Sequence, residues 1–285
     1  MRRRLARWKR HFVLPYFGGN AVAFALAGLG LVTGGPVGPL CLALLAHGAP
    51  LALLSYLYAG QRQGRTSVHL WPLQLTVYAA TTALAAWLPR SLPWFASAAV
   101  LAAGLSAAYV YWYSRLDAPG VSVLQVGRPM PEVPFEEDSH RITTGDLRGR
   151  PVAYLFLRGN WCPLCMAQAR TVAQHYQELE ALGAEVALVS PQDEEQTREL
   201  ARQLGVRFRY LRDPGLRAAR ALGIHHDDGV PVGIPGYDPD TVLPTVVVTD
   251  ADGTVVFVHQ SDNYRVRPTP DTILTALHQA TSAGR

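Results

Sequence analysis

The first 116 residues contain no acidic side chain. They carry ten Arg or Lys residues, whereas the remainder of the chain carries 16 basic and 22 acidic side chains. Six of the ten basic residues fall within the first ten positions, and the others separate long apolar runs. Positive residues that flank apolar segments are typical of a membrane protein and argue against nucleic-acid binding. The mild overall basicity is therefore an average over two unlike halves.

Four uncharged runs approach the length of a membrane-crossing helix. They extend near residues 12–32, 37–59, 67–88 and 92–113, and a helix needs about 20 residues to cross the hydrocarbon layer. We therefore expect residues 1–116 to form an all-α transmembrane segment of four helices, with the lipid bilayer as its partner. A cleaved signal peptide is a less favoured alternative, because the first run is too long and three more follow it.

The basic residues between the runs predict the orientation. The basic N-terminus, Arg62 and Arg65 between the second and third runs, and Arg115 after the fourth would lie on one side, with only Arg90 on the other. The positive-inside rule then places both termini in the cytoplasm. The expected location is the cell membrane, multi-pass, with the C-terminal domain on the cytoplasmic side.

The four uncharged runs contain few side chains that could carry protons, ions or electrons. Apart from His47 and His69 they hold no acidic or basic residue, so the acidic relay that marks a proton or ion path is missing from the sequence. Cys41 is expected to be a small apolar core residue. A transmembrane electron conduit would need redox-active groups within the membrane, and only Cys41 is offered. An anchoring role is favoured.

After a linker at residues 117–126 the pattern changes to alternating strands and helices. Helices are expected over residues 163–182, in "DEEQTRELARQLG" and in "TPDTILTALHQA", and the apolar strand-like runs are "PVAYLFL", "AEVALVS", "RFRYLRD", "LPTVVVTD" and "TVVFVHQ". This order predicts that residues 127–285 form an α/β domain with a mixed sheet flanked by helices.

The motif "LRGNWCPLCMAQ" joins the first of these strands to the first helix. Cys162 would lie at the amino end of the helix, where the dipole and unpaired N–H groups favour a thiolate, and Pro163 suits the first helical position. Cys165, one turn on, would face the same side. This spacing indicates redox chemistry without a cofactor, in which Cys162 attacks and Cys165 resolves the mixed disulfide.

Two other interpretations of the cysteine pair are disfavoured. Half of a zinc site would need further ligands, but the third cysteine lies in a membrane run and the adjacent His225 and His226 lack the usual histidine spacing. A static structural disulfide is unfavourable on the cytoplasmic side, where thiols are kept reduced. Asp227 and Asp228 are weak candidates for any other role.

The motif, together with "LPTVVVTDADGTVVF" and "NYRVRPTPDTILTAL", resembles the peroxiredoxin-like branch of the AhpC/TSA family in the thioredoxin superfamily. The resemblance covers about Gly127 to the end and implies a thioredoxin-like fold. In relatives the proline before the later strand is cis and lies against the cysteines, so Pro244 resembles that residue. Trp161 resembles the aromatic residue before the active cysteine. Arg158 would either stabilise a thiolate or be solvated at the surface.

The sequence departs from true peroxiredoxins at two places. Their peroxidatic cysteine has Thr or Ser three positions before it, where this chain has Gly159, and their arginine at the start of the later strand is replaced by Leu243 or Pro244. Both departures weaken a peroxidase interpretation. The loop "IHHDDGVPVGIPGYDPD" leads into Pro244 and would either shape a substrate groove or be an inert surface excursion.

These features predict a membrane-anchored thiol-disulfide oxidoreductase of the AhpC/TSA group, with antioxidant hydroperoxide reduction as a further activity. Its expected partners are a thiol reductant such as a thioredoxin-type protein and a disulfide or hydroperoxide substrate. The alternative is a non-enzymatic redox sensor whose disulfide state alters the membrane helices or a partner. Turnover would separate the two, because a sensor needs only one slow oxidation.

Overall fold

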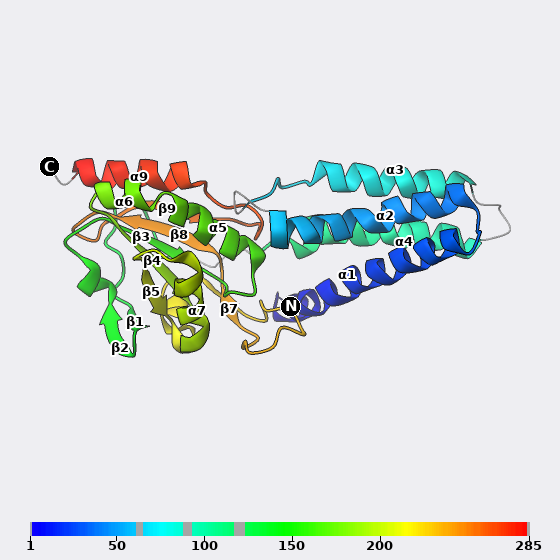
Figure 1. Ribbon diagram of the computed structural model, residues 1–285. Coiled ribbons are helices and arrows are strands. Elements are labelled where there is room, and N and C mark those ends of the chain that lie inside the picture. Colours follow the sequence, from blue (N-terminus) through cyan, green and yellow to red (C-terminus); the bar gives the residue numbers. More distant parts are fainter. Residues whose placement is uncertain (1, 61–64, 88–92, 117–122, 284–285) are drawn as a thin grey trace. The chain divides into compact units, whose positions relative to one another are not determined.

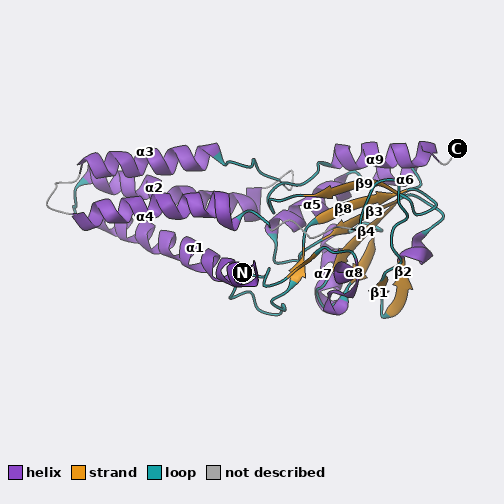
Figure 2. Ribbon diagram, turned by 180° about the vertical axis from the view of Figure 1, so that it is seen from behind, coloured by secondary structure: helices purple, strands orange, loops and turns teal. Residues whose placement is uncertain are grey.

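The computed structural model describes residues 2–60, 65–87, 93–116 and 123–283. The chain divides into two compact units, a helical unit (Met1–Gly60, Thr66–Arg115 and Pro231–Gly233) and an α/β unit (Gln61–Arg65, Leu116–Val230 and Ile234–Arg285). Figure 2 shows long helices in the first and strands together with helices in the second. Residues 117–122 of the predicted linker lie outside the described residues, as do Arg62 and Arg90.

Four α-helices make up most of the helical unit. They are α1 (Arg2–Val32), α2 (Val37–Ser55), α3 (Trp71–Trp87) and α4 (Pro93–Ala108), and the π-helical turns η1 (Tyr56–Gly60) and η2 (Tyr109–Tyr113) directly follow α2 and α4. The segments Arg7–Val32 and Val37–Tyr58 are long and apolar enough to cross a membrane. By contrast, α3 and α4 have 17 and 16 residues. The count of four crossings therefore stays a prediction.

Aromatic and polar contacts join the helices of this unit. The rings of Tyr16 on α1 and Tyr109 on η2 stack with centroids 5.3 Å apart. The Tyr16 hydroxyl lies 3.1 Å from the Ser106 Oγ, and His47 Nδ1 lies 2.9 Å from the Asn20 Oδ1. Cys41, expected to be buried, is instead exposed. That expectation was wrong because apolar composition does not show which side of α2 faces the other helices.

The α/β unit is built on a seven-stranded sheet with the strand order β2-β1-β5-β4-β3-β8-β9. Strands β3, β4 and β5 are parallel, whereas β8, β9, β1 and β2 join by antiparallel pairing. The strands are β1 (Pro134–Glu137), β2 (His140–Thr143), β3 (Val152–Phe156), β4 (Glu185–Ser190), β5 (Arg209–Arg212), β8 (Thr245–Thr249) and β9 (Val255–Gln260). The mixed sheet predicted from the sequence is confirmed.

Helices connect and cover these strands. They are α5 (Pro163–Gln174), α6 (Tyr176–Ala181), α7 (Glu194–Leu204), α8 (Arg217–Ala221) and α9 (Pro270–Ala283), with short 3-10 turns η3 (Thr144–Leu147) and η4 (Pro214–Leu216). In Figure 1, α9 lies along β8 and β9, and it contacts both strands. The single helix expected over residues 163–182 is broken, because His175 leaves helical geometry at φ −96° and ψ 18°. A separate two-stranded sheet pairs β6 (His225–His226) with β7 (Thr241–Val242).

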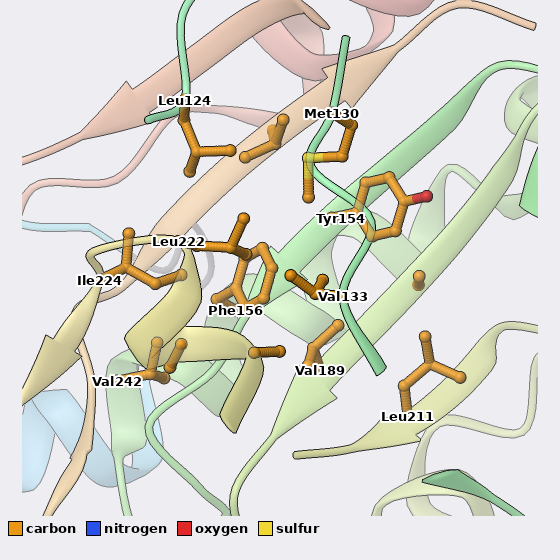
Figure 3. Packing of buried hydrophobic residues seen from close by; sticks show 14 of the residues in the cluster. Leu124, Met130, Val133, Tyr154, Phe156, Val189, Leu211, Leu222, Ile224 and Val242 are labelled. Carbon is orange, nitrogen blue, oxygen red and sulfur yellow. The ribbon is translucent and has the colours of Figure 1, made fainter. Parts of the chain in front are cut away.

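The sheet is buried on both faces at its centre. Every residue of β3 is buried, and successive side chains of a strand point to opposite faces. Figure 3 shows one face, where Tyr154 and Phe156 of β3 lie among Val189, Leu211 and Leu222. The thioredoxin-like α/β class is confirmed. This rigid centre fixes the carboxyl end of β3, where the cysteine motif begins.

Candidate active site

The cysteine motif forms the turn between β3 and α5. Leu157 continues the sheet by donating its N–H to the Val189 carbonyl at 2.8 Å. Cys162 is the N-cap residue of α5, with extended φ −88° and ψ 107°, and Pro163 is the first helical residue. Proline is compatible with this position because the N–H that it lacks would have no partner within the helix. Cys165 follows inside the first turn.

Both thiols are reduced and buried, with exposed fractions of 1 % for Cys162 and 0 % for Cys165. The two side chains are hydrogen-bonded to one another. Cys165 Sγ also accepts the backbone N–H of Arg158 at 3.4 Å and a guanidinium N–H of Arg267, from Nη2, at 3.5 Å. The hydrogen-bond donors around the pair thus converge on the second sulfur.

This asymmetry separates the two thiol pKa values. Burial raises the pKa of Cys165, but the hydrogen bond from Cys162, the charge of Arg267 and the Arg158 N–H outweigh burial and lower that pKa to about 5. Burial and the hydrogen bond to Cys165 raise the pKa of Cys162 well above its usual range. The prediction that Cys162 carries the lowered pKa was wrong for the reduced pair, because Cys162 is the donor in the bond between the thiols.

The side chain of Arg158 is buried and spans the outer part of the site. Its Nη2 donates to the Gly229 carbonyl, and its guanidinium carbon lies 4.7 Å from the Trp161 ring centroid and 5.6 Å from that of Tyr264. Trp161 in turn donates its indole N–H to the Arg158 carbonyl at 3.0 Å. A solvated surface role for Arg158 is therefore excluded, since only 3 % of the residue is exposed.

Gly159 occupies the position where peroxiredoxins have a hydroxyl residue. Its φ is +129°, a conformation that side-chain-bearing residues rarely adopt. A Cβ atom there would lie 2.9 Å from atoms of both the Trp161 and Tyr237 rings. The backbone and its neighbours thus leave no room for Thr or Ser at this point of the turn.

Pro244 is buried at the same end of the sheet as the cysteine motif. Thr245, the first residue of β8, pairs with Phe156, the last residue of β3. The described residues contain no cis peptide bond, so the cis isomer that the resemblance implied for Pro244 is not present. Leu243 donates its N–H to the Ile224 carbonyl at 2.6 Å, and the chain enters β8 through a trans Leu243–Pro244 bond.

A cavity of about 760 Å³ lies beside Arg158 and is partly walled by the long loop between β6 and β7. Val230, Tyr237 and Asp240 from that loop line it, together with Arg212 and Arg220. Its volume is within the range of small-molecule sites. His225 and His226 belong to β6, and within the described ranges no three His, Cys, Asp or Glu side chains are grouped to hold a metal ion.

Residues that the sequence analysis did not single out complete the surroundings of the cysteine motif. Arg267 donates through Nη1 to the Gln168 Oε1 at 3.4 Å, and Asn160 donates its backbone N–H to the Gln192 Oε1 at 2.9 Å. Arg267 is 102 positions from Cys165 along the chain. The only signal in the sequence was a pair of arginines in "NYRVRP", a segment that was quoted for its resemblance alone.

Comparison with known proteins shows which family this region resembles. The AhpC/TSA family model matches residues 126–258. Peroxiredoxin Q, chloroplastic, of Oryza sativa subsp. japonica is 25 % identical over 126 residues, which are 44 % of this chain and 54 % of the relative. The putative peroxiredoxin Q of Oryza sativa subsp. indica matches equally. The chain thus spans about half the length of these curated relatives.

Solved structures similar to this chain include two from peroxiredoxin studies. Reduced Prx3 from Vibrio vulnificus is 19 % identical with a TM-score of 0.48, covering 55 % of this chain and 99 % of that one. A peroxiredoxin-like protein from Aquifex aeolicus is 16 % identical with a TM-score of 0.46, covering 55 % and 88 %. Similarity at this level carries no conclusion about activity. The α/β part of the chain is thus similar to the AhpC/TSA family over residues 126–258, and its mixed sheet flanked by helices belongs to the thioredoxin-like fold class.

Proposed function

We propose that the protein is a membrane-anchored thiol-disulfide oxidoreductase in which Cys162 and Cys165 cycle between dithiol and disulfide. The observation that carries this proposal is the mutual hydrogen bond of two free thiols at the start of α5, with a lowered pKa on Cys165. Such a pair supplies the two sulfurs that disulfide exchange requires, an attacking thiol at Cys162 and a resolving thiolate at Cys165. The proposal includes three regions: a transmembrane segment at residues 1–116, a linker at 117–126 and a redox domain at 127–285.

The exchange proceeds with protons and electrons balanced. As Cys162 Sγ attacks a substrate disulfide RSSR′, its proton passes to the neighbouring Cys165 sulfur, and R′S⁻ leaves. R′S⁻ then takes that proton and becomes R′SH. Cys165 thiolate attacks the mixed disulfide at Cys162 Sγ and releases RS⁻, so the protein is oxidised and the substrate reduced. An external thiol reductant returns the pair to its starting state.

Hydroperoxide reduction is the second candidate, favoured by the family match. Its chemistry needs donors that polarise the O–O bond, and Gly159 supplies no hydroxyl. Arg158 is the nearby cation, but its Nη2 already donates to the Gly229 carbonyl. We therefore place disulfide exchange first and expect peroxide to react at the rate of an ordinary low-pKa thiol.

The deciding experiment measures turnover by the full chain in detergent micelles. With a small dithiol as reductant, we expect repeated reduction of insulin disulfides, and Cys162→Ser or Cys165→Ser should lose this activity by at least about a hundredfold. Cys41→Ser is the matched control, since Cys41 lies in the helical unit. A single oxidation without turnover would favour the redox sensor, and fast peroxide turnover would place the peroxidase first.

Two further experiments address roles and orientation. Cys165→Ser should trap a mixed disulfide on Cys162, whereas Cys162→Ser should trap none. For the four-span topology, a reporter active only in the cytoplasm should work when fused after Arg285, because the basic residues lie mostly at the start of the first helix and after the second. A reporter active only outside the cell would overturn the proposed cytoplasmic side.

A further inference from the structure

Arg267 lies in the segment between β9 and α9, and all three of its guanidinium nitrogens are engaged. Nε donates to the Tyr264 carbonyl at 3.0 Å, Nη1 to the Gln168 Oε1 at 3.4 Å and Nη2 to the Cys165 Sγ at 3.5 Å. Only 2 % of the residue is exposed. The guanidinium is thus fixed in one orientation that directs one N–H at the sulfur.

The charge of Arg267 has no carboxylate partner in the described parts of the chain. No Asp or Glu oxygen of those parts lies within the 4.0 Å that defines an ion pair, and its hydrogen-bond acceptors are a carbonyl, an amide and a thiol sulfur. A guanidinium does not deprotonate in proteins. Because an unbalanced buried charge is costly, the environment of Arg267 favours whichever partner can become an anion. Only Cys165 can.

Cys162 lacks this support. Cys165 Sγ accepts from Arg158 N, from Arg267 and from the Cys162 thiol. Cys162 instead donates a hydrogen bond to Cys165 and precedes the first turn of α5. The two sulfurs of one motif are therefore unequal, and the inequality comes from a residue outside the motif.

We propose that Arg267 is a positioning residue that holds the Cys165 sulfur as the thiolate, so that Cys165 is the leaving group when the disulfide opens and the couple is more oxidising. This inference rests on the proposed function and explains what sets the reduction potential of the Cys162–Cys165 pair. When a thiolate RS⁻ attacks Cys162 Sγ, an S–S bond to R forms, the Cys162–Cys165 bond breaks, and the electron pair stays on Cys165 beside Arg267. A second thiol RSH completes the reduction to the Cys162 thiol and RSSR.

The first test measures the equilibrium between the full chain in micelles and a glutathione redox buffer. Arg267→Gln should shift the equilibrium constant by about 10- to 100-fold toward the disulfide, which is about 30 to 60 mV toward a more reducing potential. Arg267→Lys, which keeps the charge without the fork, should shift it less. Arg170→Gln is the matched control, because Arg170 is exposed on the same helix as Cys165. An unchanged constant in folded Arg267→Gln would overturn the proposal.

The second test uses the unaltered protein and does not depend on a variant folding. If Cys165 is a thiolate, reduction takes up one proton per two electrons, so the potential should fall by about 30 mV per pH unit between about pH 7 and pH 8.5; two protons would give about 59 mV. The charged or titratable groups near the sulfurs are Arg158, Arg267 and, next to Arg267, His259. Burial and Arg267 lower the pKa of His259, which keeps it neutral in this range.

The outcomes separate this inference from the proposed function. Turnover of insulin disulfides together with a slope of about 59 mV would leave the oxidoreductase standing and overturn the role of Arg267. A slope of about 30 mV that Arg267→Gln steepens would support the role of Arg267 even in a protein without turnover. A slope that stays at about 30 mV in Arg267→Gln would assign the thiolate to other donors, and so overturn it.

Discussion

The helical unit and the α/β unit bury polar side chains in different ways. In the helical unit, neutral hydrogen bonds join side chains of different helices, as between buried Tyr16 and Ser106 and between buried Asn20 and part-buried His47. Around the cysteines of the α/β unit, Arg158 and Arg267 are almost fully buried. Neither has a carboxylate oxygen within 4.0 Å in the described ranges.

The difference indicates where chemistry resides. A neutral hydrogen-bonded pair satisfies both partners and stabilises one arrangement of helices at modest energy. Several other arginines of the α/β unit are paired with carboxylates, as in the 2.6 Å pair of Arg212 with Glu136 between the partly exposed strands β5 and β1. At the cysteines, the buried charge of Arg267 lies against a sulfur and no carboxylate of the described residues pairs with it, and such perturbed groups are typical of functional sites.

The largest expected effect is a pH dependence of stability confined to the reduced protein. The pKa of folded Cys165, about 5, lies below the ordinary value of 9.0. Its stabilisation is therefore complete above the ordinary value and lost as pH falls through about 5. Between these values the unfolded dithiol protein binds one more proton than the folded one. The free energy of unfolding of the reduced protein should therefore rise by about 1.4 kcal/mol per pH unit relative to that of the oxidised protein.

Melting temperatures of both redox forms, from about pH 6 to about pH 8, measure this gain. Cys165→Ser should abolish the pH dependence of the reduced protein, since the variant lacks the thiol whose titration produces it. Parallel curves for the reduced and oxidised wild-type protein would show that the sulfur does not balance the arginines, and the contrast between the two units would fail.

Supplying the missing carboxylate is the next strongest test. Gln168→Glu would place an acid at the position whose Oε1 accepts from Arg267 at 3.4 Å. The new charge would pair with Arg267 and repel the thiolate, so the ultraviolet thiolate absorbance should titrate about 1 to 2 pH units higher. Gln174→Glu, exposed at the end of the same helix, should leave the titration unchanged. An unchanged titration in Gln168→Glu would contradict charge balance by Cys165.

Arg158→Met should have a smaller effect on the thiolate than loss of Arg267. The contact of residue 158 with Cys165 is its backbone N–H, which methionine retains. We expect the thiolate titration to rise by less than about 1 unit. Loss of the bond to Gly229 and of the stacking on Trp161 should lower stability by about 2 kcal/mol in thermal or urea unfolding. A thiolate shift larger than that of Arg267→Gln would reverse the order assigned to the two arginines.

The smallest effect is expected in the helical unit. Asn20→Leu removes the partner of His47 and should lower stability by about 1 kcal/mol, which unfolding in mixed micelles can measure. The thiolate titration should not change. Val22→Ala, at an exposed position of the same helix, should cost less than about 0.5 kcal/mol. A change in thiolate titration with Asn20→Leu would mean that buried polar groups of the helical unit also act on the redox pair.

Local pattern predicted much of the fold. The uncharged runs gave helices near the expected residues, and "PVAYLFL" gave the buried strand β3, because apolar periodicity and helix signals depend on neighbours in sequence. The hairpin of β1 and β2 was not predicted, since "PFEEDSHRIT" has no apolar run. In the structure β1 also pairs with β5, through Glu136 and Arg212, and β5 is distant in sequence.

The sequence by itself determined the position of the cysteine motif at the strand-to-helix junction, because Pro163, the apolar strand before it and the spacing of Cys162 and Cys165 are local features. Only the tertiary structure decided which sulfur carries the charge. That choice depends on Arg267, which is 102 residues from Cys165 and reaches it because α9 and β9 lie next to β8, the neighbour of β3. Electrostatic energy depends on distance in space and on burial, and neither is encoded by spacing along the chain.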